Sequence, residues 1–169
     1  MRNTNVISTR LLAAMMVGVV LLSDQISKWW LLEQFAGMDH PMREVTSFFN
    51  VVLVRNTGVS FGLFAALRQP MVLTAVSGVI IAILLCWLMK NPTRLVGIAL
   101  GCVIGGAVGN VIDRLRFGAV TDFLDFHWNA YHWPAFNIAD SAIFIGVVLL
   151  AVSSMFEPHC HSEHKEPVV

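Results

Sequence analysis

Four long apolar runs are the feature of this 169-residue sequence that most restricts its fold. Each has close to the ~20 apolar residues that an α-helix needs to cross the hydrocarbon core of a bilayer. The runs cover about residues 11–32, 70–89, 95–112 and 138–156. Charged residues make up 13% of the chain, about half of their share in a typical soluble domain. We therefore expect one integral membrane domain over residues 1–169, mostly α-helical, with four transmembrane helices.

The segments between the runs are too polar to span, and we expect residues 33–69 and 113–137 to be extracytoplasmic. Phe48–Val54 is rich in aromatic and β-branched residues, which predicts a short strand. A turn signature at Arg55–Gly58 and a second apolar run, Val59–Phe64, follow. The first segment should therefore contain a small extracytoplasmic β element.

The other connecting segment, Phe123–Phe136, is aromatic, with Trp128, Tyr131 and Trp133. Residues of this kind are typical of the level at which lipid meets water. The segment therefore predicts an interfacial loop or an amphipathic helix that lies on the bilayer.

A short basic connection sets the expected orientation. Lys90 and Arg94 lie within five residues between the second and third runs, and short basic loops of this kind tend to be cytoplasmic. With four spans, both termini are then cytoplasmic as well. The formal net charge is zero, so no basic surface predicts a nucleic acid partner.

Glycines recur at a strict interval of four residues along the third run, at Gly97, Gly101, Gly105 and Gly109. Glycines so spaced make one face of a helix smooth, which lets a neighbouring helix approach closely. We expect the third helix to be the central packing element.

Polar residues gather at the outer ends of the expected helices. Asp24 and Lys28 lie one turn apart, where they can pair on one helix face or simply end the helix near the headgroups. Amides and acids also recur three residues apart, at the end of the third helix and at the start of the fourth. These residues are Asn110, Asp113, Arg114, Asn137 and Asp140, with Asp122 and Asp125 in the connection. Because acids at membrane level are costly, this recurrence favours one shared site.

The chemistry open to such a set is narrow. The sequence has no GxSxG, HExxH or glycine-rich phosphate loop, so covalent and metalloprotease schemes lack their parts. Two carboxyls close together in a low dielectric share a proton, and such a pair activates water and polarises a carbonyl. The residues alone leave open which two of Asp113, Asp122, Asp125 and Asp140 form the pair.

Two other functional classes of membrane protein remain possible at this point. A small membrane transporter or ion-path subunit would use the same acids, but it should have them spread through the membrane depth. A metal-dependent lipid transferase would need paired DxxD clusters on helices, and these are not present with suitable spacing, since Asp122 and Asp125 give only one such pair.

Five ordered motifs resemble those of the lipoprotein signal peptidase (signal peptidase II) family, along nearly the whole chain. They are DQISK at 24–28, VRNTG at 54–58, GNVIDR at 109–114, VTDFLDF at 120–126 and FNIADS at 136–141. The resemblance implies an aspartic endopeptidase with Asp122 and Asp140 as the catalytic pair and Asp125 as a spectator. It also implies supporting residues, namely Asn56, Gly58, Asn110, Asp113, Arg114, Asn137, Asp24 and Lys28.

The family's substrate is a prolipoprotein that carries diacylglycerol on the cysteine just after the cleavage point. The implied partners are therefore lipid-modified prolipoproteins and membrane phospholipid. The implied location is the bacterial cytoplasmic (inner) membrane, with the active site near the outer leaflet of a monomer that uses no cofactor. The tract His159–His164 is typical of a disordered tail, so we expect no metal site there.

Overall fold

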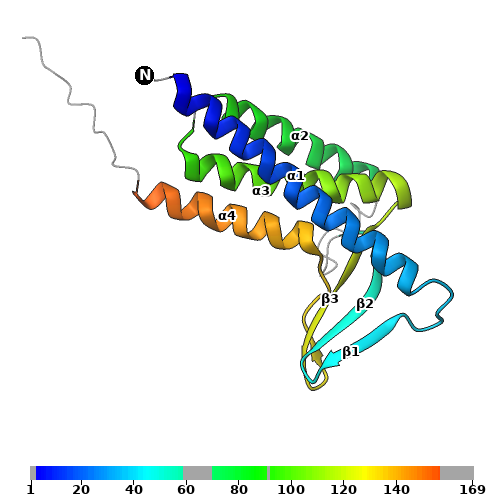
Figure 1. Ribbon diagram of the computed structural model, residues 1–169. Coiled ribbons are helices and arrows are strands. Elements are labelled where there is room, and N and C mark those ends of the chain that lie inside the picture. Colours follow the sequence, from blue (N-terminus) through cyan, green and yellow to red (C-terminus); the bar gives the residue numbers. More distant parts are fainter. Residues whose placement is uncertain (1–2, 59–69, 91, 157–169) are drawn as a thin grey trace, which may run out of the picture.

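A computed structural model describes residues 3–58, 70–90 and 92–156 of the chain. The described helices form a bundle, and the strands extend from one end of it (Figure 1). The helices are α1 (Asn3–Gln34), α2 (Pro70–Met89), α3 (Arg94–Phe117) and α4 (Ile138–Phe156). All four are long and apolar enough to cross a membrane, which confirms the expected fold class. The expected apolar run Val59–Phe64 and the tract His159–His164 lie outside the described residues.

Helix α3 continues past the apolar run at 95–112 and ends at Phe117. Asp113 and Arg114 are therefore helical residues and do not lie in a connecting loop. Gly118 ends the helix because its φ of 68° is a left-handed conformation that glycine adopts without strain. Its N–H donates to the carbonyl of Arg114 at 3.0 Å, and the chain then turns into the sheet.

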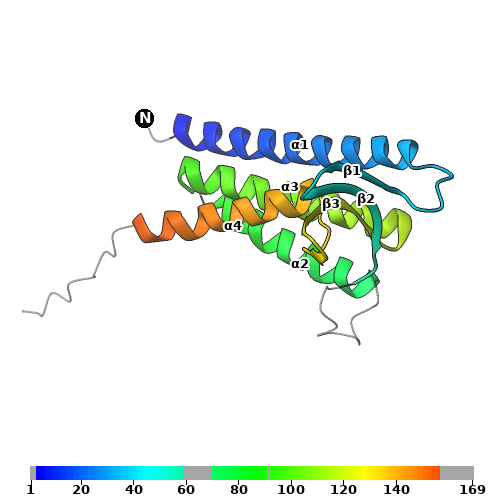
Figure 2. The same ribbon diagram turned by 90° about the horizontal axis from the view of Figure 1, so that it is seen from below.

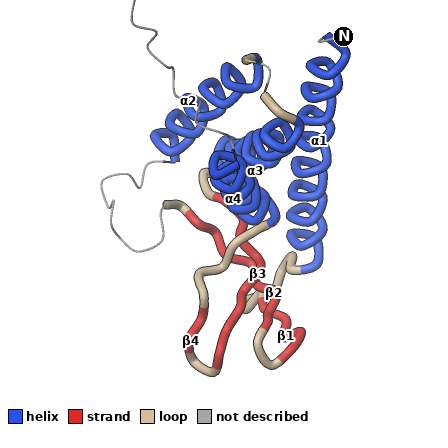
Figure 3. The backbone as a smooth tube through the Cα atoms, turned by 90° about the vertical axis from the view of Figure 1, so that its left-hand side faces the viewer, coloured by secondary structure: helices blue, strands red, loops and turns tan. Residues whose placement is uncertain are grey.

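Helix α3 is the central element, as its glycines indicate. It packs against each of the other three helices, and α1 and α2 lie on opposite sides of it (Figure 3). A Cβ atom at Gly101 would lie 2.7 Å from the carbonyl oxygen of Ala13, and one at Gly105 would lie 3.1 Å from that of Val17. The glycine face thus brings the backbones of α1 and α3 together.

A second close approach, at Gly106, sets the position of α4. A Cβ atom at Gly106 would lie 2.4 Å from the carbonyl oxygen of Ala139, in the first turn of α4. We expect Gly106→Ala to push this turn away and to lower the free energy of unfolding by about 1–3 kcal/mol. Thermal unfolding in detergent micelles measures the loss.

The matched control is Gly18→Ala, because nothing lies within 4 Å of a Cβ atom at Gly18. Alanine is the better helix former by about 1 kcal/mol, so this control should be neutral or slightly stabilising. Equal stability of the two variants would show that the α3–α4 contact at Gly106 is not tight.

The strands form one antiparallel sheet in the order β1-β2-β3-β4. They are β1 (Met42–Thr46), β2 (Phe49–Asn56), β3 (Val120–Trp128) and β4 (Tyr131–His132). Seen from below, the sheet lies near the end of α1 and the start of α4 (Figure 2). Phe123 fixes it there by packing in a buried apolar cluster with Leu31 of α1 and with Phe35, which follows α1.

The expectation of a loop or an amphipathic helix over Phe123–Phe136 is wrong. Most of the first half of this segment belongs to β3, which pairs with β2 along its length. The partner strand lies about 70 residues earlier in the chain, so the pairing leaves little trace in the local sequence pattern. Pairing in the sheet fixes the faces on which the side chains of β3 lie, and therefore the different surroundings of Asp122 and Asp125.

Candidate active site

Asn137 lies just before α4 and fixes the orientation of Asp140 in the first turn of that helix. The side-chain oxygen of Asn137 accepts a hydrogen bond from the N–H of Asp140 at 2.9 Å. In return, the carboxylate of Asp140 accepts one from the N–H of Asn137 at 3.3 Å. This reciprocal pair is a capping box with an amide and an acid in the two roles, and it satisfies helix N–H groups that otherwise lack partners.

The same asparagine reaches the second aspartate. Its side-chain nitrogen donates to Oδ1 of Asp122, on β3, at 2.7 Å. Asn56 at the end of β2 donates to Oδ2 of Asp122 at 2.9 Å. Asn56 also accepts from the N–H of Gly58 at 3.1 Å. The same side chain therefore stabilises the turn after β2 and binds Asp122. Asn137 thus joins Asp122 and Asp140, which come from different elements.

Asn110 of α3 completes the connection from the side of the bundle. Its side-chain nitrogen donates to Oδ1 of Asp140 at 2.8 Å. Its oxygen accepts from Asn137 at 3.3 Å and from the ammonium of Lys28 at 3.4 Å. Each carboxylate therefore receives hydrogen bonds on both of its oxygens, which holds the two groups in fixed orientations.

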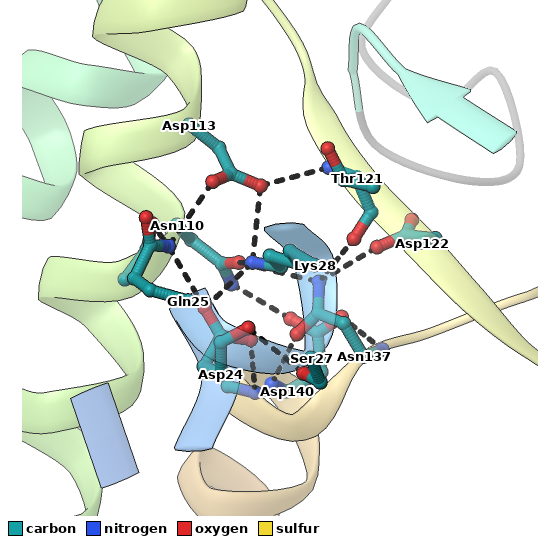
Figure 4. Close-up of polar contacts among 12 residues, drawn as sticks. Asp24, Gln25, Ser27, Lys28, Asn110, Asp113, Thr121, Asp122, Asn137 and Asp140 are labelled. Carbon is teal, nitrogen blue, oxygen red and sulfur yellow. Dashed lines mark hydrogen bonds and ion pairs between the residues drawn. The ribbon is translucent and has the colours of Figure 1, made fainter. Parts of the chain in front are cut away.

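A buried ion network lies beside this pair and is linked to it through Asn110 (Figure 4). The ammonium of Lys28 lies 2.8 Å from Asp24 and 3.0 Å from Asp113, and all three side chains are buried. Helix α1 continues beyond Lys28 to Gln34, so this is not an exposed pair that ends a helix near the headgroups. Asp113 also accepts from the N–H of Thr121 at 2.9 Å, which ties α3 to the residue before Asp122.

Two further residues, Gln25 and Thr121, take part in these contacts and were not predicted from the sequence. Gln25 donates to Asp24 at 3.1 Å and to Asp113 at 3.2 Å, so it links the two acids of the ion network. The carbonyl of Thr121 accepts from Asn137 at 3.3 Å. Gln25 lies in the motif DQISK and Thr121 in VTDFLDF. Neither residue is charged, so the pattern of charged residues in the sequence did not point to them.

Asp125 lies elsewhere, although the sequence made it nearly as good a candidate as Asp122. Its carboxylate accepts from Asn50 at 3.0 Å and lies 3.0 Å from Nδ1 of His132. Burial acts to raise the pKa of Asp125, but the hydrogen bonds from His132 and Asn50 outweigh it, so the pKa is lowered. Asp125 thus contributes to the sheet and not to the cluster around Asn137.

The electrostatics of Asp122 differ from those of Asp125. Asp122 is only 2% exposed, and this burial raises its pKa to about 6. The hydrogen bonds from Asn56 and Asn137 oppose the rise, and the negative charge of Asp140 adds to it. A carboxyl with such a pKa exchanges its proton near neutral pH.

This shift has a consequence for stability. The folded protein holds the proton of Asp122 more tightly than the unfolded chain, so the free energy of unfolding should fall as pH rises from about 4 to about 6. Two pKa units correspond to a loss of about 3 kcal/mol. Thermal unfolding of the wild type and of Asp122→Asn across this window measures it. The wild type should lose stability relative to the variant, and a constant difference would contradict the raised pKa.

An apolar cavity of about 370 Å³ opens beside Asp140. It is lined by Trp133, Phe136, Asp140, Ser141, Phe144 and Ile145. Phe144 and Ile145 are exposed on the outer face of α4, a helix apolar enough to lie in lipid. One of the two aspartates therefore borders a cavity that continues onto the lipid-facing surface.

Comparisons with known proteins agree on one family. The family model for signal peptidase (SPase) II matches residues 16–156. A lipoprotein signal peptidase of Burkholderia cenocepacia is 50% identical over 137 residues, which cover 78% of this chain and 80% of the relative. One of Shewanella amazonensis is 47% identical over 142 residues, which cover 82% of this chain and 83% of the relative.

A solved structure gives the same result for the fold. It is titled a bacterial membrane enzyme structure by the in meso method at 2.3 Å resolution, and its sequence is 27% identical to this one. The match has a TM-score of 0.74 and covers 93% of both chains. The matches in sequence and in fold extend over most of the chain, which belongs to the signal peptidase II family.

Proposed function

We propose that this protein is an intramembrane aspartic endopeptidase that removes signal peptides from diacylglyceryl-modified prolipoproteins. It would cut just before the lipidated cysteine with water activated by Asp122 and Asp140. The proposal depends on one observation: Asn137 binds both carboxylates, of which Asp122 is buried and Asp140 is partly buried. The relatives named lipoprotein signal peptidase support the substrate class.

The charges around the pair support a shared proton. The cluster has more acids than cations, with Asp24, Asp113, Asp122 and Asp140 against Lys28 and Arg114. Lys28 is already paired with Asp24 and Asp113, so Asp122 and Asp140 lack a cation of their own within ion-pair distance in the described part of the chain. Two carboxylates that are both ionised would repel in this low dielectric, and one proton between them removes the repulsion.

A pair with one proton has the two groups that peptide hydrolysis needs. The ionised carboxylate accepts a proton from water as the oxygen attacks the scissile carbonyl. The protonated partner donates a hydrogen bond to that carbonyl and later gives its proton to the leaving amine. The hydrogen bonds from Asn56, Asn110 and Asn137 keep both carboxyls in orientation during this exchange.

Arg114 is suited to binding the substrate. Asp113 is the acid next to Arg114 in the sequence, but its carboxylate already binds Lys28, Gln25 and the backbone N–H of Thr121. Arg114 is half-buried and forms no ion pair within 4.0 Å among the described residues. Its guanidinium group is therefore available for a carbonyl of the precursor, which a planar set of donors fits well.

The apolar cavity beside Asp140 fits a lipid-modified precursor. Its rim of aromatic side chains borders the lipid-facing surface of α4, so an acyl chain stays in an apolar environment while the adjoining peptide meets the aspartates. The acids also gather at one end of the bundle, and α2 has none. An ion path would need them at several depths, so this distribution favours the peptidase.

Cleavage of a diacylglyceryl-modified precursor by the purified protein, with a chelator present, tests the proposal. We expect one cut, immediately before the lipidated cysteine, and mass spectrometry of the two products locates it. The matched control is the same precursor without the lipid, which should be cut far more slowly. A reaction that stops with chelator and resumes with added metal would remove the aspartic mechanism.

A further inference from the structure

Two arginines from different elements meet on one aromatic ring beside the candidate active site. The guanidinium carbon of Arg55, on β2, lies 4.5 Å from the ring centroid of Phe117. That of Arg116, on α3, lies 5.1 Å from the same centroid. The two cations are therefore no farther apart than the sum of these distances. Stacking on the ring face offsets part of their repulsion, but it supplies no negative charge.

The described residues provide no acid for these two cations. None of the ion pairs within 4.0 Å in the described part of the chain includes Arg55 or Arg116. Arg55 donates to the hydroxyl of Thr121 at 2.7 Å, which fixes its guanidinium group and leaves other N–H groups free. Two like charges on one ring, one of them fixed by Thr121 and neither paired with an acid among the residues described, form a site that attracts an anion.

The position of the site in the bundle identifies the anion. Phe117 is the last residue of α3, a helix long and apolar enough to cross the membrane. The ring of Phe117 is 42% exposed, so the two cations lie on an aromatic surface that faces the surroundings of the helix. A basic and aromatic surface at the end of a transmembrane helix lies at headgroup depth, where the anions are lipid phosphates.

We propose that Arg55, Arg116 and Phe117 bind the phosphate of an anionic phospholipid. The guanidinium groups donate to the phosphate oxygens, because their planar N–H pairs match phosphate geometry. The acyl chains of the lipid then extend from the end of α3 toward the hydrocarbon core of the membrane. We name this set the arginine clamp.

The arginine clamp also connects to the aspartates. Arg55 holds the side chain of Thr121, and Thr121 precedes Asp122 on β3. A lipid bound there fixes the end of α3 and the start of β3 at one depth in the membrane. The clamp does not depend on the peptidase proposal, because lipid retention can be measured without any substrate.

Native mass spectrometry of the protein released from detergent micelles tests the clamp, with phosphatidylglycerol and phosphatidylcholine as the probes. We expect the wild type to retain phosphatidylglycerol in preference to phosphatidylcholine. The double variant Arg55→Gln/Arg116→Gln should bind phosphatidylglycerol about tenfold or more weakly. Arg116→Gln alone should show a smaller loss in the same direction, and it leaves the Arg55 contact to Thr121 intact if the double variant fails to fold.

The matched control is Arg43→Gln/Arg94→Gln, which removes the same charge from exposed positions on β1 and at the far end of α3. This control should keep the affinity of the wild type. Equal retention by the clamp variant and the wild type, or an equal loss in the control, would overturn the proposal. Displacement of phosphatidylglycerol by inorganic phosphate at equal concentration would also overturn it, since the site would then take free phosphate.

Discussion

Replacing either Asp122 or Asp140 with asparagine should abolish cleavage of the lipid-modified precursor, with a fall in rate of about 10²- to 10⁴-fold or more. Asparagine keeps the size of the side chain but can neither accept the proton of water nor donate one to the leaving amine. Both carboxylates sit in hydrogen-bond networks that hold their orientation. The variants should therefore accumulate in the membrane while processing stops, and single-turnover cleavage measures the loss.

Asp125→Asn is the matched control, because it removes a carboxylate three residues further along the same strand. Asp125 contacts Asn50 and His132 and takes no part in the cluster around Asn137. We expect this variant to keep activity within a few-fold of the wild type. Full activity in Asp122→Asn or in Asp140→Asn would show that another group activates the water.

Replacing Lys28 with methionine should give the largest loss of stability. Its side chain is 3% exposed and its ammonium lies between Asp24 and Asp113, so removal leaves two buried carboxylates without compensation. Breaking a buried ion pair from one side costs about 3–5 kcal/mol. The free energy of unfolding in detergent micelles, or the yield of folded protein where unfolding is not reversible, measures this loss.

The double variant Lys28→Met/Asp24→Asn separates charge from packing. It restores the formal charge of the cluster, and asparagine retains an oxygen to accept from the N–H of Ala139. We expect it to recover a substantial part of the stability that Lys28→Met loses. If Lys28→Met unfolds within about 1 kcal/mol of the wild type, the two acids are not held as charged groups.

The helices could be predicted from the sequence because their signals are local. Length and hydropathy indicate a spanning helix with no knowledge of its neighbours, and the glycines of α3 indicate close packing by their spacing alone. The sheet was harder to predict. Strand β3 finds its partner about 70 residues away, so the aromatic segment Phe123–Phe136 suggested a surface element.

Because strand β3 was not predicted, physical reasoning on the sequence could not decide whether Asp122 or Asp125 belongs to the candidate catalytic pair. Side chains an odd number of positions apart on a strand point to opposite faces, so only one of the two can face α4. With β3 recognised, the spacing would have predicted different surroundings for them. The Lys28–Asp113 contact was also hidden, because the sequence reveals the pair one turn apart and not the partner on another helix.

Infrared titration of the aspartate carboxyl groups tests the coupled pair most directly. The difference between the wild type and Asp122→Asn isolates the carboxyl of Asp122, and we expect it to titrate near pH 6. In an Asp140→Asn background the same carboxyl should titrate lower, because the negative neighbour is gone. A carboxyl at position 122 that titrates near the ordinary aspartate pKa of about 3.9, unchanged by Asp140→Asn, would contradict a proton shared between the two residues.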